Sequence, residues 1–169
     1  MAGNEKCEQL TEVRDVLLIL NKISIFAGLT DEQLHSLFQL LETVHYDAGE
    51  TVFKQGDHPG HIYVIRFGRI KLVATKDDTP FELVVFEQGQ CFGESSVIGI
   101  QPHAATAIAV EDTELLTLSR QAMLSIYSTD LGLFSMLIMN IARETCRRLR
   151  SSSEVILHYV QESNNSHAS

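Results

Sequence analysis

The residues of this chain best suited to chemistry lie in one stretch, residues 92–106. Gly93 has no side chain, so the backbone can turn tightly there and approach a ligand closely. Glu94, the next residue, offers carboxylate oxygens that accept hydrogen bonds from neighbouring hydroxyl groups. Acceptors of this kind beside a tight backbone turn are typical of a site that binds a sugar.

The remainder of this stretch favours an anion next to the sugar. Residues 95–98 are expected to form one helical turn, whose free N–H groups and positive dipole end attract negative charge. Pro102 fixes the backbone before His103, and Ala104 and Ala105 are small enough to leave their own N–H groups accessible. We therefore predict that residues 92–106 form a cradle for a sugar phosphate.

The order Phe-Gly-Glu, a helical turn and Pro-x-Ala-Ala-Thr resembles the phosphate-binding cassette of cyclic-nucleotide-binding domains of the catabolite activator and kinase regulatory subunit type. This resemblance implies that the ligand is cAMP or cGMP and that Glu94 holds the ribose 2'-hydroxyl. It also implies that Gly93, Ser95 and Ala104 present backbone groups to the ligand, with Phe92 and Ala105 in the same binding site.

The chain departs from the family at His103, where the family usually has an arginine that holds the cyclic phosphate. Loss of one charge-assisted hydrogen bond weakens binding by roughly ten to a few hundred fold if nothing compensates. Two hypotheses therefore stay open. One is a regulatory domain in signal transduction that binds a cyclic nucleotide or related phosphate and repositions its C-terminal helix. The other is a ligand-free domain that acts as a protein-interaction or dimerisation module.

The elements that must position this stretch begin with two N-terminal helices. Apolar residues recur at helical spacing after Thr11, and Thr30 with Gln33 forms the sequence signature of a capping box for a second helix. Residues 1–14 are expected to be a loose tail, and residues 15–130 a β-roll of the cyclic-nucleotide-binding kind. The apolar positions that predict the first helix are Val13, Val16, Leu17 and Leu20.

From residue 44 the pattern changes to short runs rich in valine, isoleucine, phenylalanine and tyrosine, separated by turn signals. This pattern predicts an antiparallel sandwich or barrel. Together with the family resemblance, it gives a mainly β fold with flanking helices: a jelly-roll barrel, or double-stranded β-helix. The expected strands cover residues 44–46, 51–53, 61–66, 69–75, 81–86, 105–110 and 114–118.

The C-terminal part is expected to be helical. Ser119 is a candidate N-cap for a short helix, and a long dimerisation helix is expected over residues 131–160, followed by a disordered tail over residues 161–169. Spacings of three and four residues define a seam suited to a two-helix contact, although packing of this face on the chain's own barrel is the alternative. The seam consists of Ala142, Thr145, Leu149, Ser152, Ile156 and Tyr159.

The family resemblance also implies that Ser152 and Ser153 reach the base of the nucleotide. The arginines at positions 143, 147, 148 and 150 are interpreted as part of a solvated helix face, because glutamates lie among them. The chain carries a formal net charge of −9, which repels a polyanion, and no helix-turn-helix fits after residue 160. We expect no direct nucleic-acid partner, and output through a homodimer or another protein.

Other classes of function are disfavoured. Three cysteines without metal-binding spacing and the lack of a membrane-spanning apolar run predict a cytoplasmic protein with reduced thiols and no membrane association. His58 and His61 lack the further ligands of a cupin metal site, so no metal is expected. Ser95 and Ser96 have no nucleophile motif. The chain is therefore predicted not to be an enzyme, and to need no cofactor besides a bound cAMP or cGMP.

Overall fold

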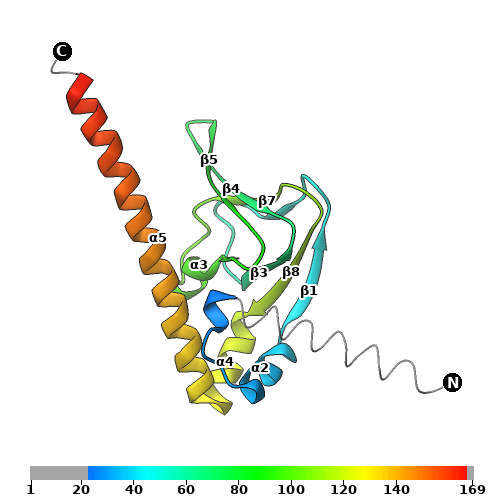
Figure 1. The fold of residues 1–169 in the computed structure, drawn as a ribbon. Helices are drawn as coiled ribbons and strands as arrows, with labels where there is room; N and C mark the ends of the chain where they lie inside the picture. Colours follow the sequence, from blue (N-terminus) through cyan, green and yellow to red (C-terminus); the bar gives the residue numbers. More distant parts are fainter. Residues whose placement is uncertain (1–22, 167–169) are drawn as a thin grey trace.

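A computed structural model describes residues 23–166 (Figure 1). The expected first helix over residues 11–20 and the tail over residues 1–14 lie outside the described residues. The described chain opens with a 3-10 turn, η1 (Ser24–Phe26), and a helix, α2 (Asp31–Phe38). The predicted capping box at Thr30 is confirmed, because the Thr30 hydroxyl accepts from the Gln33 N–H at 3.2 Å and the Gln33 side chain accepts from the Thr30 N–H at 3.1 Å.

The strands form two antiparallel sheets of four strands each, in the orders β1-β8-β3-β6 and β2-β7-β4-β5. The predicted jelly roll is confirmed, and each expected strand exists with bounds shifted by at most a few residues. One strand, β6, was not expected from the sequence. The strands are β1 (Glu42–Tyr46), β2 (Thr51–Phe53), β3 (His61–Phe67), β4 (Ile70–Lys76), β5 (Thr79–Phe86), β6 (Cys91–Phe92), β7 (Thr106–Ala109) and β8 (Thr113–Ser119).

The buried apolar side chains form two clusters. One lies between the sheets and includes Ile65, Phe92 and Leu115. The other lies between the barrel and the helices and includes Leu34 and Ile62. Each fully buried side chain of this size contributes about 1.5–3 kcal/mol to folding. Phe92, the first residue of the predicted cassette, and Ala107, just after its last residue, both belong to the first cluster, so the core between the sheets anchors both ends of the cassette.

Two helices follow the barrel. The predicted cap of α4 (Arg120–Thr129) is confirmed, because the Ser119 hydroxyl accepts from the Ala122 N–H at 3.0 Å. The long helix α5 (Leu131–Ser166) begins where expected but continues to Ser166. Residues 161–166, which we predicted to belong to a disordered tail, are therefore helical. The reason is that no glycine or proline interrupts the helix after Gly132, and serine and asparagine weaken a helix without breaking it.

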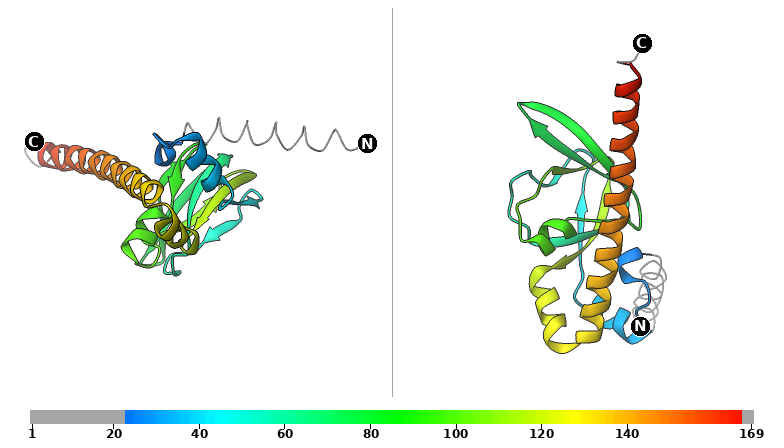
Figure 2. Two further views of the ribbon diagram at one scale, coloured as in Figure 1. Left: turned by 90° about the horizontal axis from the view of Figure 1, so that it is seen from below. Right: turned by 90° about the vertical axis from the view of Figure 1, so that its left-hand side faces the viewer.

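The first half of α5 is part of the domain core, whereas the second half projects away from it (Figure 2). Leu133, Leu137 and Ile141 are buried against the N-terminal segment and the barrel. The predicted seam lies on a different face of α5. Its described members, Ala142, Thr145, Leu149, Ser152 and Ile156, are all exposed. Ala142 and Thr145 line an open space beside α3, and the seam is not packed tightly on the chain's own barrel. The side chain of Tyr159 is not among those described. None of the helices in the described part of the chain is long and apolar enough to span a membrane.

Candidate functional site

The predicted cassette is one continuous segment of the chain. It runs from the end of β6 through the helix α3 (Glu94–Gly99) and a loop to the start of β7. The helical turn expected over residues 95–98 is present in α3. Gly93 precedes α3 with φ of +82°, in the left-handed region that favours glycine. A Cβ atom at Gly93 would lie 3.0 Å from both the His61 carbonyl oxygen and the Tyr63 ring. The bend therefore requires glycine for its conformation and for its close contact with β3.

This bend supports a direct prediction. Gly93→Ala should destabilise the protein by about 1–3 kcal/mol, because it combines left-handed strain with a contact too close for a Cβ atom. Gly89→Ala is the matched control, since Gly89 has φ of +83° and a Cβ atom added there would meet no atom within 4 Å, so it isolates the conformational cost. Chemical denaturation measures both variants. Equal losses in the two would show that the close approach at Gly93 places no constraint.

Glu94 is the most constrained polar residue of the cassette. It is only 2% exposed, and its Oε1 accepts a hydrogen bond from Arg148 Nη1 at 2.7 Å. Its second carboxylate oxygen, Oε2, is buried and has no hydrogen-bond partner within the described part of the chain. Burial raises the pKa of Glu94 above its ordinary value, while the Arg148 guanidinium acts in the opposite direction. Glu94 thus retains a free acceptor inside the protein.

Arg148 joins the cassette to α5. Besides Glu94, it donates from Nη2 to the Cys91 carbonyl oxygen at 2.5 Å and from Nε to Glu144 Oε1 at 3.2 Å. Its guanidinium carbon also lies 4.7 Å from the centre of the Phe86 ring, a cation–π distance. Glu144 is fixed in turn by a hydrogen bond from the Ser24 hydroxyl at 3.1 Å. One arginine therefore connects β5, β6, α3 and α5.

This role of Arg148 differs from the expectation that the arginines of α5 belong to a solvated face. One signal in the sequence pointed to it. Residues 137, 141, 144 and 148 are spaced by four, three and four positions, which places Arg148 on the same side of the helix as Leu137 and Ile141. For Arg148 the solvated-face interpretation is wrong, since its side chain is only 28% exposed.

His103 does not extend from the cassette as a phosphate clamp would. It is 4% exposed, and its ring stacks on Phe53 with centroids 3.6 Å apart and planes 11° apart. The backbone N–H of His103 donates to the Asp57 carbonyl at 2.9 Å, and the backbone carbonyl of His103 accepts from the Gly56 N–H at 2.8 Å. Burial lowers the pKa of His103, partly opposed by the Asp57 carboxylate. In this conformation the imidazole is neutral near pH 7.

The other predicted site residues fall into three groups. Phe92 is fully buried and stacks on Tyr63 with ring centroids 5.0 Å apart, so it anchors the start of the cassette in the core. Ser95 and Ala104 are exposed, whereas Ala105 is buried. Ser152 and Ser153 lie about one turn beyond Arg148 on α5 and are exposed; the Ser153 hydroxyl donates to the Leu149 carbonyl at 2.9 Å. The structure therefore brings Phe92, Gly93, Glu94 and Arg148 together, with Ser152 and Ser153 farther along α5.

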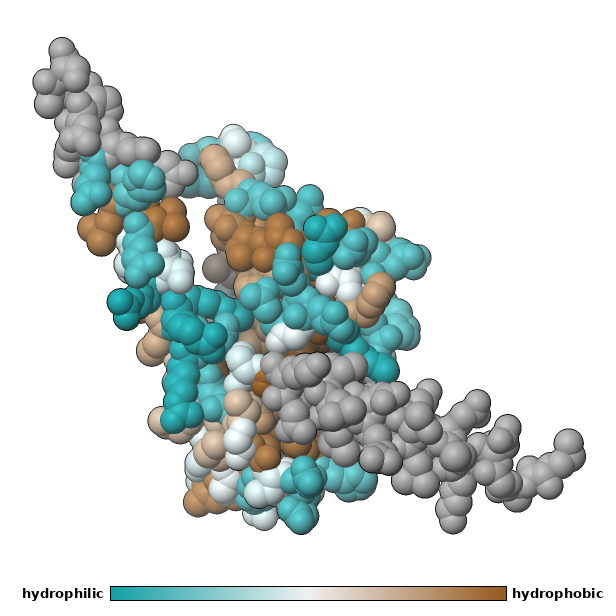
Figure 3. Space-filling model, in the orientation of Figure 1, coloured by the Kyte–Doolittle hydropathy of each residue, from teal (hydrophilic) through white to brown (hydrophobic). Residues whose placement is uncertain are grey.

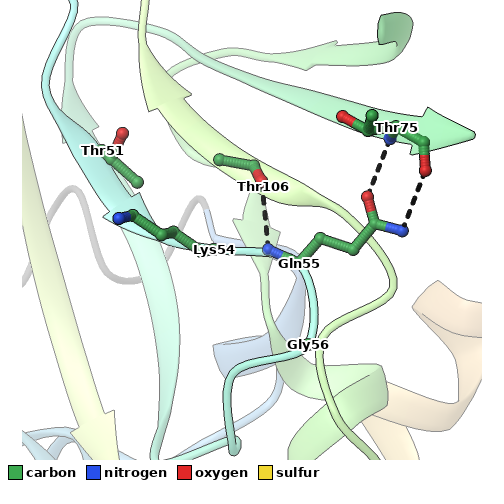
Figure 4. Close-up of a pocket in the computed structure, with 6 residues that line it drawn as sticks. All are labelled: Thr51, Lys54, Gln55, Gly56, Thr75 and Thr106. Atoms are coloured by element: carbon green, nitrogen blue, oxygen red, sulfur yellow. Dashed lines mark hydrogen bonds between the residues drawn. The ribbon is translucent and has the colours of Figure 1, made fainter. Parts of the chain in front are cut away.

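Two cavities border the cassette. The first, of about 380 Å³, lies between α3 and α5, with Glu94, Ile98, Ile141 and Thr145 among its lining residues. The second, of about 680 Å³, lies at the other end of the cassette (Figure 4). Its lining residues are Thr51, Lys54, Gln55, Gly56, Thr75 and Thr106.

Gln55 fixes the end of the cassette within the second cavity (Figure 4). Its side-chain amide pairs with both backbone groups of Thr75, accepting from the N–H at 2.8 Å and donating to the carbonyl at 3.3 Å. Its own N–H donates to the Thr106 hydroxyl at 3.0 Å. These bonds hold the segment that follows β2, the end of β4 and the last cassette residue together. In the described ranges, no group of three histidine, cysteine, aspartate or glutamate residues is arranged to hold a metal ion.

The sequence around this site is similar to that of known proteins. The sequence profile of a family described as "Cyclic nucleotide-binding domain" matches residues 43–130, which include the whole cassette. The Cyclic AMP receptor protein of Thermus thermophilus is 30% identical over 143 residues, covering 83% of this chain and 64% of that protein. A cGMP-dependent protein kinase of Caenorhabditis briggsae is 29% identical over 110 residues, covering 63% of this chain. This chain corresponds to only 15% of that kinase.

Solved structures agree with the sequence matches. The crystal structure of the Thermus thermophilus Catabolite Activator Protein superposes with a TM-score of 0.70 at 30% identity, over 79% of this chain and 61% of that one. A cyclic nucleotide-binding domain from Methylobacillus flagellatus superposes with a TM-score of 0.78 over 87% of this chain and 83% of that chain. Its sequence identity is 21%, so that likeness concerns the fold.

Proposed function

This chain belongs to the cyclic nucleotide-binding domain family, and from this premise we propose that it is a regulatory domain that binds cAMP or cGMP in the cassette of residues 92–106. The observation that carries the proposal is the buried, unpartnered Oε2 of Glu94. An unsatisfied buried acceptor costs about 1–3 kcal/mol, and folded proteins rarely keep one without a reason. A ribose 2'-hydroxyl that donates to this oxygen removes the cost.

The contact between Glu94 and Arg148 also supports a structural connection from the ligand site to α5. Glu94 and the Cys91 carbonyl both hold Arg148. A ligand hydroxyl that shares the Glu94 carboxylate changes the strength of the Glu94–Arg148 pair. Because Arg148 is itself a residue of α5, we propose that ligand binding changes the position of this helix relative to the cassette. Ser152 and Ser153, about one turn farther along, then contact the base.

The output is proposed to be a protein interaction. The exposed seam of α5 supports a homodimer, and a repositioned helix would present a new surface to another protein partner. The net charge of −9 disfavours binding to nucleic acid. The free cysteines Cys91 and Cys146 are consistent with action in the cytoplasm, where thiols stay reduced.

One observation favours the second candidate, a ligand-free interaction module: the His103 ring is stacked on Phe53 instead of pointing out for a phosphate. Isothermal titration calorimetry with cAMP and cGMP decides between the two, with AMP as the non-cyclic control. Saturable binding of a cyclic nucleotide that exceeds binding of AMP supports the sensing domain. Absence of binding for both cyclic nucleotides at millimolar concentration would contradict it and favour the interaction module.

If the site binds a phosphate, affinity should depend on pH through His103. The free imidazole has a lowered pKa, whereas a phosphate beside it would favour the imidazolium and raise the pKa. Binding then takes up a proton between these two pKa values, so affinity should rise as the pH falls from about 8 toward 6. Calorimetry in buffers of different ionisation enthalpy measures this proton uptake.

Two variants at this position test the assignment. His103→Arg should bind about tenfold to a few hundred fold more tightly near pH 7.5, with the His103-linked proton uptake removed, because arginine stays charged. His103→Gln, which cannot titrate, should bind weakly and also without that uptake. A wild-type proton uptake that persists in His103→Gln would assign it to another group.

A further inference from the structure

The charges of the cassette are poorly suited to a phosphate. Residues 92–106 contain no lysine or arginine, and apart from His103 their one ionisable side chain is that of Glu94. The fold brings Arg148 to the cassette, but its nitrogens already donate to Glu94, to Glu144 and to the Cys91 carbonyl. A phosphate that enters this site therefore meets a carboxylate, and the cassette has no cation of its own to pair with it.

The position of His103 adds to this mismatch. In the proposed function the phosphate lies beside residue 103, so the imidazole would have to face it. Instead the ring is buried and stacks on Phe53 with centroids 3.6 Å apart. The centroid of the Phe53 ring lies 5.6 Å from that of Tyr63 and 6.0 Å from that of Phe92, so the imidazole belongs to an aromatic cluster. Burial lowers the pKa of His103, and the Asp57 carboxylate opposes this only in part, so the ring is neutral above pH 7.

The first turn of α3 gives a phosphate little further support. This helix has six residues and begins at Glu94, so a carboxylate already lies at the positive end of the helix dipole. A phosphate brought to the same end would be repelled by that carboxylate. Removing a charge from water without pairing it with a cation is also unfavourable. An uncharged ligand avoids both penalties.

The carboxylate of Glu94 is well suited to an uncharged diol. Its Oε2 has no hydrogen-bond partner within residues 23–166, and its Oε1 accepts a bond from Arg148. Each carboxylate oxygen can accept two hydrogen bonds, so both oxygens can accept from a ligand. A free nucleoside offers neighbouring 2'- and 3'-hydroxyls, whereas the cyclic phosphate of cAMP or cGMP leaves only the 2'-hydroxyl free. A nucleoside can therefore donate two charge-assisted hydrogen bonds to Glu94 where a cyclic nucleotide donates one.

The molecule also has room for a base. In the space-filling view an open space separates the second half of α5 from the barrel, with apolar side chains on both of its sides (Figure 3). Ser152 and Ser153, which are proposed to contact the base, lie on this half of α5. Apolar walls with a few hydrogen-bonding groups are typical of sites for small organic molecules. A nucleoside keeps the whole of its base, so it loses none of these contacts.

We propose that the cassette binds uncharged nucleosides, adenosine or guanosine, at least as tightly as the corresponding cyclic nucleotides while His103 is neutral. The proposal rests on the proposed cyclic-nucleotide function, because it uses the same ribose acceptor, and it names a second class of ligand for that site. Glu94 accepts from the diol, Arg148 holds Glu94, and the stacked His103 leaves the phosphate position without a cation.

Calorimetric titration of the full chain at about pH 8, where an imidazole is neutral, tests this proposal with adenosine, guanosine, cAMP, cGMP and AMP. For the base that binds better, the nucleoside should bind at least as tightly as its cyclic nucleotide. AMP has the same diol as adenosine but carries a charged phosphate, so it should bind more weakly than adenosine.

The outcomes separate this proposal from the proposed function. A cyclic nucleotide that binds more tightly than its nucleoside, or AMP that binds as tightly as adenosine, overturns the proposal and does not contradict the cyclic-nucleotide function. Binding of a nucleoside without binding of cAMP or cGMP supports the proposal and contradicts that function. Absence of binding for all five ligands contradicts both.

Deoxynucleosides test the diol. For the better-bound base, the 3'-deoxynucleoside should bind about tenfold to 150-fold more weakly than the parent nucleoside, because one hydrogen bond to a charged acceptor is lost. The 2'-deoxynucleoside should lose a similar factor. A 3'-deoxynucleoside that binds as tightly as its parent overturns the assignment of both hydroxyls to Glu94.

His103→Arg should reverse the order of the two ligand classes. A permanent cation beside the phosphate should make the cyclic nucleotide bind about tenfold or more tightly than its nucleoside. Glu87→Gln is the control, since Glu87 is exposed and precedes the cassette, and it should keep the wild-type order. Circular dichroism checks that each variant is folded. A folded His103→Arg protein that still prefers the nucleoside overturns the role given to His103. The ligand series on the wild type tests the proposal even if His103→Arg does not fold.

Discussion

Glu94→Gln is expected to reduce the affinity for a cyclic nucleotide by about tenfold to 150-fold. The substitution keeps the shape of the side chain but replaces a charged acceptor by a neutral one, and a hydrogen bond to a charged group contributes about 1.5–3 kcal/mol. The effect should be large because Glu94 is almost completely buried and its Oε2 has no other partner in residues 23–166. Glu94→Ala, which removes the acceptor altogether, should abolish binding.

Calorimetric titration of the wild type and the variants measures this loss. Glu87→Gln is the matched control, because it makes the same chemical change on an exposed residue just before the cassette, and its affinity should equal that of wild type. A Glu94→Gln protein that is folded and binds as tightly as wild type would show that the ligand does not use this carboxylate.

The same carboxylate predicts an acid limit for binding. The pKa of Glu94 is already raised by burial, and a donating ribose hydroxyl favours the ionised form and lowers this pKa. Affinity should therefore fall as the pH drops through the raised pKa of the free protein, a trend opposite in sign to that of His103. Glu94→Gln should lose this acid limit.

Arg148→Leu is expected to destabilise the fold by about 2–4 kcal/mol near pH 7. Removal of one partner from a buried ion pair leaves an uncompensated charge, which typically costs about 3–5 kcal/mol, and the partial exposure of Arg148 reduces this cost. Glu144 keeps Arg147 as an ion-pair partner in this variant, so the uncompensated charge is that of Glu94. Urea denaturation monitored by circular dichroism measures the loss.

The pH dependence of this loss tests its cause. Without Arg148, which lowers the pKa of Glu94, that pKa in the folded state should rise further above the ordinary value of 4.5. When the pKa of a carboxyl is higher in the folded state than in the unfolded state, the protonated carboxyl does not destabilise the fold at low pH. The fold then loses stability as the pH rises and the carboxyl ionises. The difference between wild type and Arg148→Leu should thus be smallest below about pH 4.5 and grow as the pH rises through the variant's raised pKa.

Two further proteins isolate the pair. In the double variant Glu94→Gln/Arg148→Leu the buried charge is absent, so most of the stability should return. Arg150→Leu makes the same change nearby on α5, where the arginine is 83% exposed and pairs with Glu154, and its stability should match that of wild type. A loss of equal size in Arg150→Leu would trace the effect to the helix and not to the Glu94 contact.

The sequence by itself determined the architecture and the position of the cassette. Both depend on local signals: the alternation of apolar runs with turns, the capping residues Thr30 and Ser119, and a glycine where the backbone turns into α3. Interactions of this kind join residues a few positions apart, so spacing alone reveals them. The strand β6 escaped detection because two residues carry no periodicity, and only pairing with β3 defines it.

Only the tertiary structure decided how the site residues are used. Glu94 meets Arg148 across 54 positions, and His103 meets Phe53 across 50, contacts that no spacing rule encodes. Helical periodicity placed the seam on one side of α5 but left open whether that side packs on the barrel. The fold answered this question, since Leu137 and Ile141 are the residues of α5 buried in the core, and the described seam residues are exposed. Contacts between residues far apart in the chain depend on tertiary packing, because the interior is closely packed and buried polar groups must find hydrogen-bond partners there.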